Sequence, residues 1–258
     1  MTSQPRSIDF DPVAHWYDLF VRTSLDCDFW VEEAGRFAGP KLELMCGTGR
    51  LSLPVLRAGI ALTCADYSLG QLEQFARKLR AETLAADLVC ADARALPFER
   101  TFDAVFIGFQ SFAELASEED QRAGLASIGR ALRPGGRLVL SLHNPAVRAP
   151  QLDGVWKDFG AVPIPGSSQR LHVSARFAYD ATCQLASGVQ RYRVLEQDGA
   201  VSQEHDLPVR FRLLTAEQFE RLALQQGLQV ERWWGDYQRS PLDPATSPFL
   251  IAEVRLRP

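Results

Sequence analysis

The chain has 258 residues, of which 46% are hydrophobic and 23% are charged, which predicts a globular protein with one large domain or one domain with an insertion. Its net charge of -4 weighs against a nucleic-acid partner, because proteins that bind nucleic acids usually carry a basic face. No apolar run approaches the roughly 18 residues of a membrane span, and residues 1–10 lack the apolar segment of a secretory signal, so we expect a cytoplasmic protein without a membrane partner.

Cysteine spacing bears on metals and disulfides. The chain has five cysteines, which are widely spaced and include no C-x-x-C pair. This pattern predicts neither a zinc site nor a disulfide framework. We therefore expect no bound metal, and we expect Cys46, Cys64 and Cys90 to be small buried residues with reduced thiols.

Two aromatic-rich segments open the chain. Residues 11–23 contain Trp16, Tyr17 and Phe20 and are expected to be helical, and residues 26–38 show apolar side chains at helical spacing. A Gly-Pro pair ends the second segment. We expect residues 1–38 to form a helical lid over the domain that follows.

Strands and helices then alternate. Helices are expected after Gly49, over residues 68–79 and after Ser117. The expected strands are residues 41–46, 60–65, 88–90, 102–108 and 137–142. Alternating units of this spacing predict a parallel sheet with helices on both faces.

The alternation breaks at His143. Residues 144–168 resemble a loop, and three β-like runs follow at residues 170–179, 188–195 and 209–214. Their polar and apolar alternation predicts antiparallel strands, with Asp198-Gly199 as a hairpin turn. We therefore expect residues 144–212 to form an antiparallel insertion.

The alternating pattern resumes after this insertion. Thr215 and Gln218 match a capping box, which predicts a helix from there through Gln226. Residues 228–234 and 249–256 are expected to be the last two strands.

A turn with two glycines, Gly47 and Gly49, lies between the first expected strand of the alternating part and the helix after it. Such a turn lets backbone N–H groups approach a ligand closely at a helix N-terminus. A dinucleotide site would have a third glycine where Ser52 stands.

Three acids surround this turn. Glu43 lies within the first of these strands, Asp66 closes the second and Asp92 closes the third. The carboxyl ends of successive parallel strands line one crevice. Asp66 can accept hydrogen bonds from both ribose hydroxyls and Asp92 from an adenine amino group. The set suits a ligand with a cationic end and without phosphate groups.

These residues resemble the class I S-adenosylmethionine-dependent methyltransferases. The resemblance is carried by residues 43–49, by Asp66, by Asp92-Ala93, by residues 102–110 and by the turn at residues 132–138. It implies S-adenosylmethionine as the cofactor and S-adenosylhomocysteine as the product. The implied fold is an α/β, Rossmann-like seven-stranded sheet, mostly parallel with the last strand antiparallel, with an inserted antiparallel β roof. Residues 39–143 and 213–258 would form the cofactor domain.

The same resemblance implies which residues bind the cofactor, with Glu43 near the methionyl amino group. Met45 stands where the family usually has a glycine, so it either reshapes the turn or belongs to the substrate pocket. The implied cofactor-binding residues are Tyr17, Arg22, Glu43, Met45, Gly47, Gly49, Asp66, Tyr67, Asp92, Ala93, Phe109 and Gln110.

Candidates for catalysis and acceptor binding lie in the covering segments. His143, at the end of a strand, is the candidate base, with a loop-capping hydrogen bond as the alternative. Tyr17 would lie over the reacting centre, with a half-exposed helix position as the alternative. The expected acceptor-binding residues are Trp156, Arg176, His205 and Tyr237.

The resemblance implies methyl transfer to a nitrogen or oxygen of a small molecule. The alternatives are a non-catalytic protein that binds the cofactor or its product, and a methyltransferase that acts on a protein or RNA. The Asn/Asp-Pro-Pro-aromatic run of enzymes that methylate bases is missing after residues 102–108. Insertions of this kind sometimes pair between subunits, so a homodimer is a further expectation.

Overall fold

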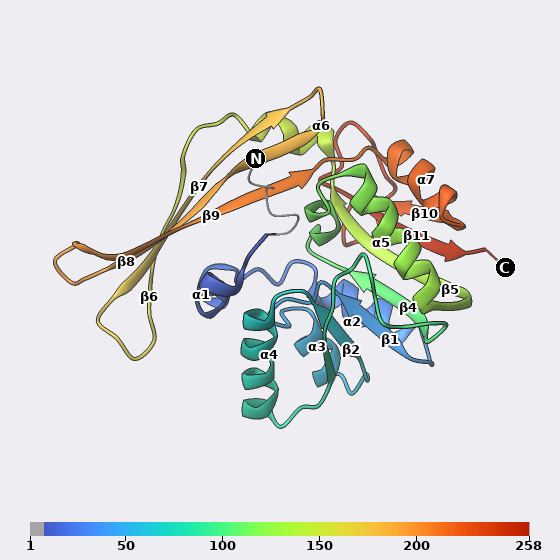
Figure 1. Ribbon diagram of the computed structural model, residues 1–258, viewed down its shortest axis with the longest axis horizontal. Helices are drawn as coiled ribbons and strands as arrows, with labels where there is room; N and C mark the ends of the chain where they lie inside the picture. The colour runs from blue at the N-terminus through green and yellow to red at the C-terminus, as the bar shows by residue number, and fades with distance from the viewer. Residues whose placement is uncertain (1–7, 258) are drawn as a thin grey trace.

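A computed structural model describes residues 8–257 of the protein, and what was expected of residues 1–7 lies outside the described residues. Figure 1 shows a central sheet with helices on both faces and a second sheet that extends to one side. The central sheet has the strand order β10-β11-β5-β4-β1-β2-β3. Its strands are β1 (Lys41–Leu44), β2 (Thr63–Asp66), β3 (Asp87–Cys90), β4 (Phe102–Ile107), β5 (Leu132–His143), β10 (Leu228–Trp234) and β11 (Phe249–Leu256).

The strand pairing confirms the predicted sheet. β1 pairs in parallel with β2 and β4, β2 with β3, and β4 with β5. β11 lies antiparallel between β5 and β10. The carboxyl ends of β1 to β4 therefore meet at one edge, which is where open α/β sheets bind ligands.

Helices cover both faces of this sheet because its strands carry apolar side chains on both sides. On one face Val105 packs with Leu125 and Phe219, and on the other Phe106 belongs to a cluster with Phe75. The helices are η1 (Asp11–Val13), α1 (Ala14–Phe20), α2 (Cys27–Gly35), α3 (Ser52–Arg57), α4 (Leu69–Glu82), η2 (Ser111–Glu114), α5 (Glu118–Ala131), α6 (Pro145–Arg148), η3 (Ala149–Gln151) and α7 (Ala216–Gln225).

Local capping explains where several helices begin. The Ser68 hydroxyl accepts a hydrogen bond from the Gln71 N–H at the start of α4, and Ser117 caps α5 in the same way. At α7 both hydrogen bonds of the predicted capping box are present, between Thr215 and Gln218.

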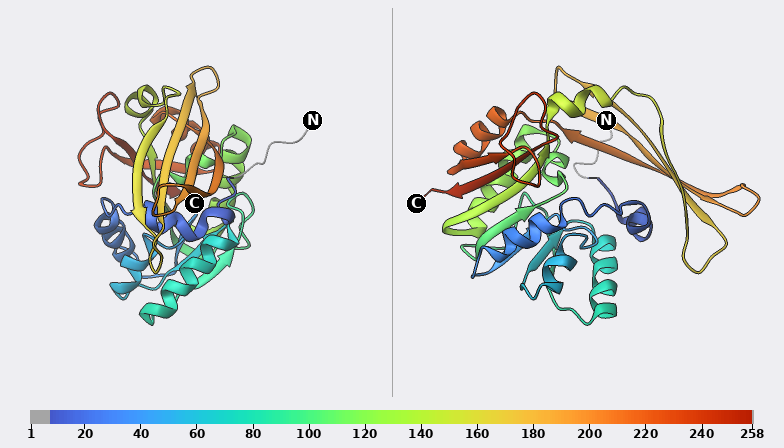
Figure 2. Two further views of the ribbon diagram at one scale, coloured as in Figure 1. Left: turned by 90° about the vertical axis from the view of Figure 1, so that its left-hand side faces the viewer. Right: turned by 180° about the vertical axis from the view of Figure 1, so that it is seen from behind.

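The insertion forms a separate antiparallel sheet of four strands, in the order β6-β7-β8-β9. These strands are β6 (Lys157–Pro163), β7 (Arg170–Asp180), β8 (Leu185–Leu195) and β9 (Val201–Arg212). The hairpin turn at Asp198-Gly199 is confirmed, since it connects β8 and β9. One face of this sheet covers α1, where Trp16 stacks on Tyr192 with ring centroids 5.9 Å apart; Figure 2 shows α1 beneath the sheet.

The expected strands of the insertion were wrong in two places. Residues 157–163 were expected to be loop but form β6. This strand pairs only with β7 at the sheet edge, is largely exposed and contains Gly160, so its sequence lacks the apolar alternation of a buried strand. β9 begins at Val201 rather than at residue 209. Its first half carries Glu204 and Asp206, which pair with arginines of β8 and so give no apolar alternation.

Residues 145–151, also expected to be loop, form α6 and η3 after Asn144, whose side chain caps the first of these turns. No helix among residues 8–257 is long and apolar enough to cross a membrane.

Candidate functional site

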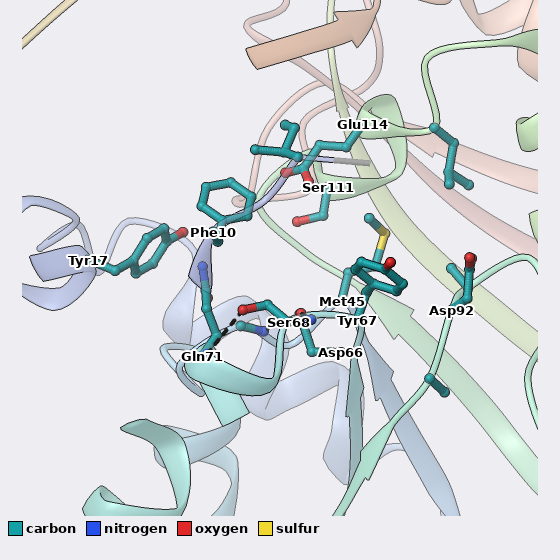
Figure 3. A pocket seen from close by; sticks show the side chains of 15 residues that line it. Phe10, Tyr17, Met45, Asp66, Tyr67, Ser68, Gln71, Asp92, Ser111 and Glu114 are labelled. Carbon is teal, nitrogen blue, oxygen red and sulfur yellow. Dashed lines mark hydrogen bonds between the residues drawn. The ribbon is translucent and has the colours of Figure 1, made fainter. Parts of the chain in front are cut away.

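A cavity of about 700 Å³, counted out to its open mouth, lies at the carboxyl ends of β1, β2 and β3. Residues 8–17 and η2 close it from the other side (Figure 3). The lining residues are Ile8, Phe10, Tyr17, Met45, Gly47, Asp66, Tyr67, Ser68, Gln71, Ala91, Asp92, Ala93, Ser111, Glu114 and Leu115. Seven of the twelve residues expected to bind the cofactor are in this list.

The two glycines of the turn are required by conformation and by packing. Gly47 and Gly49 have φ values of 57° and 80°, in the left-handed region that favours glycine. A Cβ atom on Gly49 would lie 2.3 Å from the Phe75 ring of α4. Gly49 therefore lets α4 approach the turn, while Gly47 lines the cavity itself.

Met45 keeps the backbone conformation of a glycine. Its φ is 60°, which costs a side-chain-bearing residue roughly 1–2 kcal/mol. Its side chain lines the cavity (Figure 3). Met45 therefore combines a backbone conformation that favours glycine with a place in the cavity wall.

Asp66 is fixed by the backbone at the end of β2. One carboxylate oxygen accepts a hydrogen bond from the Gly47 N–H at 2.7 Å, and the other from the Ser68 N–H at 2.8 Å. Burial raises the pKa of Asp66 in spite of these bonds. Because a carboxylate has about four acceptor sites, each oxygen can accept one more hydrogen bond from a ligand in the cavity.

Asp92 also lines the cavity, but it is paired. Its carboxylate accepts hydrogen bonds from the Arg94 guanidinium, with the shortest N–O distance at 2.5 Å. Arg94 bridges to Asp120 at 2.9 Å. Tyr67, by contrast, is 60% exposed, so its ring is available to an aromatic ligand group at the cavity mouth.

Glu43 lies beside the main cavity rather than in its lining. It is buried, accepts a hydrogen bond from the Ser52 hydroxyl, and lines a second, smaller space with Trp30 and Leu51. Burial raises its pKa to about 7, against the lowering effect of the Ser52 hydrogen bond. At neutral pH Glu43 thus takes both protonation states.

The segment that contains η1 and α1 is attached to the glycine turn and to α4. The Asp18 carboxylate accepts hydrogen bonds from the Thr48 hydroxyl at 2.6 Å and from the Lys78 ammonium at 2.8 Å. Asp11 accepts hydrogen bonds from the Ser68 hydroxyl and from the Gly70 N–H. These bonds place Tyr17 over the cavity. Burial, followed by the charge of Glu114, raises the pKa of Tyr17, so its hydroxyl stays protonated and can donate a hydrogen bond.

The arginine near the turn is Arg50 and not Arg22. Arg22 is exposed and lies outside the cavity lining. Arg50 pairs with Asp26 at 2.6 Å and lies 4.4 Å over the centre of the Phe109 ring. Phe109 is outside the lining as well, and its neighbour Gln110 donates a hydrogen bond to the hydroxyl of Tyr237 at 3.1 Å.

His143 lies outside the cavity lining too. Its ring packs against Phe249 and Phe211, with centroids 6.3 and 6.5 Å away. Burial, with a smaller effect of the Arg148 charge, lowers the pKa of His143 to about 3. A group with this pKa does not retain a proton at neutral pH, so its surroundings do not favour the predicted role as a base.

The low pKa of His143 predicts a pH dependence of stability. An unfolded chain binds a proton at His143 below about pH 6.5, whereas the folded chain does so only near pH 3. The free energy of unfolding should therefore fall as the pH decreases from 6.5, by up to about 1.4 kcal/mol per pH unit. Between about pH 7 and pH 5, the variant His143→Gln should lose about 2 kcal/mol less than the wild type in urea unfolding. Equal losses would contradict the buried neutral state.

The expected acceptor-binding residues are spread over the molecule, and none lines this cavity. Trp156 and Arg176 lie on the exposed part of the second sheet, where the guanidinium of Arg176 is 5.2 Å from the Trp156 ring. His205 is a partly exposed residue of β9. Tyr237 is buried against Phe249.

The sequence patterns did not identify Glu114 as a site residue. It ends η2, just after β4, and its side chain points into the cavity (Figure 3). Burial, and then the charge of Asp66, raises its pKa to about 8. The available signal was its position after a strand end, at the same edge of the sheet as Asp66.

Comparisons with known proteins agree with this geometry. Residues 42–136 match the model of a methyltransferase domain family. A demethylmenaquinone methyltransferase of Streptomyces avermitilis is 34% identical over 160 residues, which are 58% of this chain and 66% of that protein. The chain spans between 39% and 66% of the length of the first three curated relatives that it matches.

Solved structures share the fold over nearly the whole chain. An S-adenosylmethionine-dependent methyltransferase from Clostridium acetobutylicum superposes with a TM-score of 0.76 at 20% identity, covering 96% of this chain and 99% of that one. CalS10, an amino pentose methyltransferase from Micromonospora echinaspora solved with S-adenosylmethionine bound, gives 0.68 at 18% identity, covering 95% and 96%. The chain thus contains a methyltransferase domain at residues 42–136 and has the fold of the class I S-adenosylmethionine-dependent methyltransferases.

Proposed function

We propose that the protein transfers a methyl group from S-adenosylmethionine to a nitrogen or oxygen atom of a small molecule. The observation that carries the proposal is the cavity at the strand ends, where Asp66 meets the glycine turn. The cofactor supplies an electrophilic methyl group on a sulfonium. Methyl transfer needs alignment and exclusion of water more than it needs an acid or a base.

The lining residues fit this cofactor. The two free acceptor sites of Asp66 suit the ribose hydroxyls, and Tyr67 and Ala93 suit the two sides of an adenine ring. No lysine, arginine or histidine is found among the described lining residues, which matches a cofactor that has no phosphate. The aromatic rings of Phe10 and Tyr17 suit a cationic sulfonium.

The remaining predicted contacts belong to the same proposal. Glu43 would meet the methionyl amino group from the smaller space beside the turn. Tyr17 would contact the cofactor or the acceptor with its protonated hydroxyl. Residues 1–38 would act as the lid and residues 144–212 as the insertion that covers the acceptor. Residues 39–143 and 213–258 would form the cofactor domain.

The proposal includes the cellular setting. We infer a cytoplasmic enzyme that acts on small molecules rather than on a nucleic acid or a membrane, which the net charge of -4 and the acidic cavity support. The exposed four-stranded sheet is where two chains would pair in a homodimer. Sedimentation of the purified protein tests that pairing.

The experiment that tests the activity uses radiolabelled S-adenosylmethionine and two acceptor panels, one of amines and one of phenols and alcohols. We expect label in the product of at least one acceptor, and a thermal shift with S-adenosylhomocysteine alone. A thermal shift with S-adenosylhomocysteine, but no turnover on either panel or on protein or RNA, favours the non-catalytic binding protein. Label on protein or RNA alone favours the macromolecular acceptor.

A further inference from the structure

Glu114 is a carboxyl group without a partner inside the cavity. Within residues 8–257, no hydrogen bond or ion pair is formed by its side chain, although it is largely enclosed. Figure 3 shows the carboxyl group near Ser111, on the opposite side of the cavity from Asp66. An enclosed carboxyl group without a partner is unfavourable when ionised, so a ligand is expected to supply its partner.

The other charged lining groups already have partners. Asp92 is paired with Arg94, and Asp66 accepts two backbone N–H hydrogen bonds. In the described part of the chain, the lining contains three carboxyl groups and no cationic side chain. The contacts proposed for the cofactor therefore do not use the carboxyl group of Glu114.

The charge of the cavity distinguishes amine acceptors from hydroxyl acceptors. A phenol or alcohol becomes a strong nucleophile by losing its proton, which leaves negative charge on oxygen, and the acidic lining of this cavity would oppose that charge. An ammonium group is attracted by the same lining and by the faces of Phe10 and Tyr17. Because Glu114 has a pKa of about 8, it can take a proton from a bound ammonium near neutral pH.

We propose that the acceptor is an amine and that Glu114 binds its ammonium group and accepts its proton. The inference rests on the proposed function. The proton moves from the ammonium nitrogen to a Glu114 oxygen, and the freed lone pair then forms a bond to the methyl carbon. The carbon–sulfur bond breaks with its electron pair left on sulfur. The methylated amine keeps the positive charge, and Glu114 releases its proton to solvent.

The first test needs no acceptor. Sinefungin carries an amino group where the cofactor carries its methylsulfonium, whereas S-adenosylhomocysteine has a neutral thioether there. At about pH 9, where Glu114 is ionised, we expect the wild type to bind sinefungin more tightly than it binds S-adenosylhomocysteine. In Glu114→Gln the dissociation constant of S-adenosylhomocysteine divided by that of sinefungin should fall about tenfold or more. The affinity for S-adenosylhomocysteine itself should stay unchanged within about twofold. Glu73→Gln, an exposed change on α4, should keep the wild-type ratio.

The second test is turnover on the same amine and hydroxyl panels. We expect the wild type to methylate amines, and Glu114→Gln to lose at least about 100-fold in kcat/KM. An unchanged ratio in the first test, or label on hydroxyl acceptors alone, overturns the assignment of Glu114 while the methyltransferase remains. If none of the cofactor, sinefungin or S-adenosylhomocysteine binds, the proposed function itself fails.

Discussion

The variant Asp66→Ala is expected to bind S-adenosylhomocysteine at least about 100-fold more weakly than the wild type. Hydrogen bonds to a charged group contribute about 1.5–3 kcal/mol each, and the proposal gives Asp66 two of them from the ribose. The change also removes the acceptor of the Gly47 and Ser68 N–H groups, which hold the turn against the start of α4. Isothermal titration calorimetry measures the affinity, and turnover should fall below detection.

Two further variants make this result specific. Asp103→Ala removes a partly exposed acid of β4 that lies outside the cavity lining and pairs with Arg133 at 2.9 Å, and it should leave the affinity unchanged. Asp66→Asn keeps one acceptor oxygen, so its loss should be intermediate. If Asp66→Ala is folded by circular dichroism and still binds S-adenosylhomocysteine normally, the ribose assignment is wrong.

The variant Arg50→Ala is expected to lower the free energy of unfolding by about 3–5 kcal/mol. Asp26 is 2% exposed and accepts two hydrogen bonds from Arg50, at 2.6 and 2.8 Å. Removing the guanidinium leaves a buried carboxylate with the Trp30 indole N–H as its remaining side-chain donor. Cofactor affinity should fall as well, because Arg50 stacks on Phe109 beside the glycine turn.

Arg57→Ala is the matched control. Arg57 makes a similar forked pair with Glu82, with both distances at 2.7 Å, but their side chains are 54% and 33% exposed. Solvent screens such a pair, so the loss should stay below about 1 kcal/mol. Urea unfolding measures the free energy of unfolding of the two variants. Similar losses in both would show that burial does not strengthen the contribution of the Arg50–Asp26 pair. The double variant Arg50→Met with Asp26→Asn removes both charges and should recover most of the loss.

Local patterns explain which elements could be predicted. The bounds of β10 and β11 agree with the expected residues 228–234 and 249–256, because apolar runs and turn residues mark them within the chain. The capping box at Thr215 is equally local. β6 and the first half of β9 were missed because their stability comes from pairing with distant strands and from charge pairs across the sheet.

In the candidate site, too, the positions of some residues follow from the sequence and those of others do not. Asp66 ends β2 and Asp92 follows the neighbouring parallel strand β3, so their presence at one edge follows from the order of strands and helices. His143 also ends a strand, yet its ring turns to Phe249 on β11, a strand that begins more than a hundred residues later. Which face a strand-end side chain occupies depends on the register with such partners.

The sequence alone determined the class of the fold and the family of the ligand, because alternating strands and helices, two glycines and the acids beside them are local features with a fixed geometry. Only the tertiary structure decided that Met45 keeps a glycine conformation, that Arg50 pairs with Asp26, and that Glu114 enters the cavity. These outcomes depend on burial and on contacts between distant segments, which set the environment and protonation of each side chain. The proposed preference for amines therefore comes from the folded cavity.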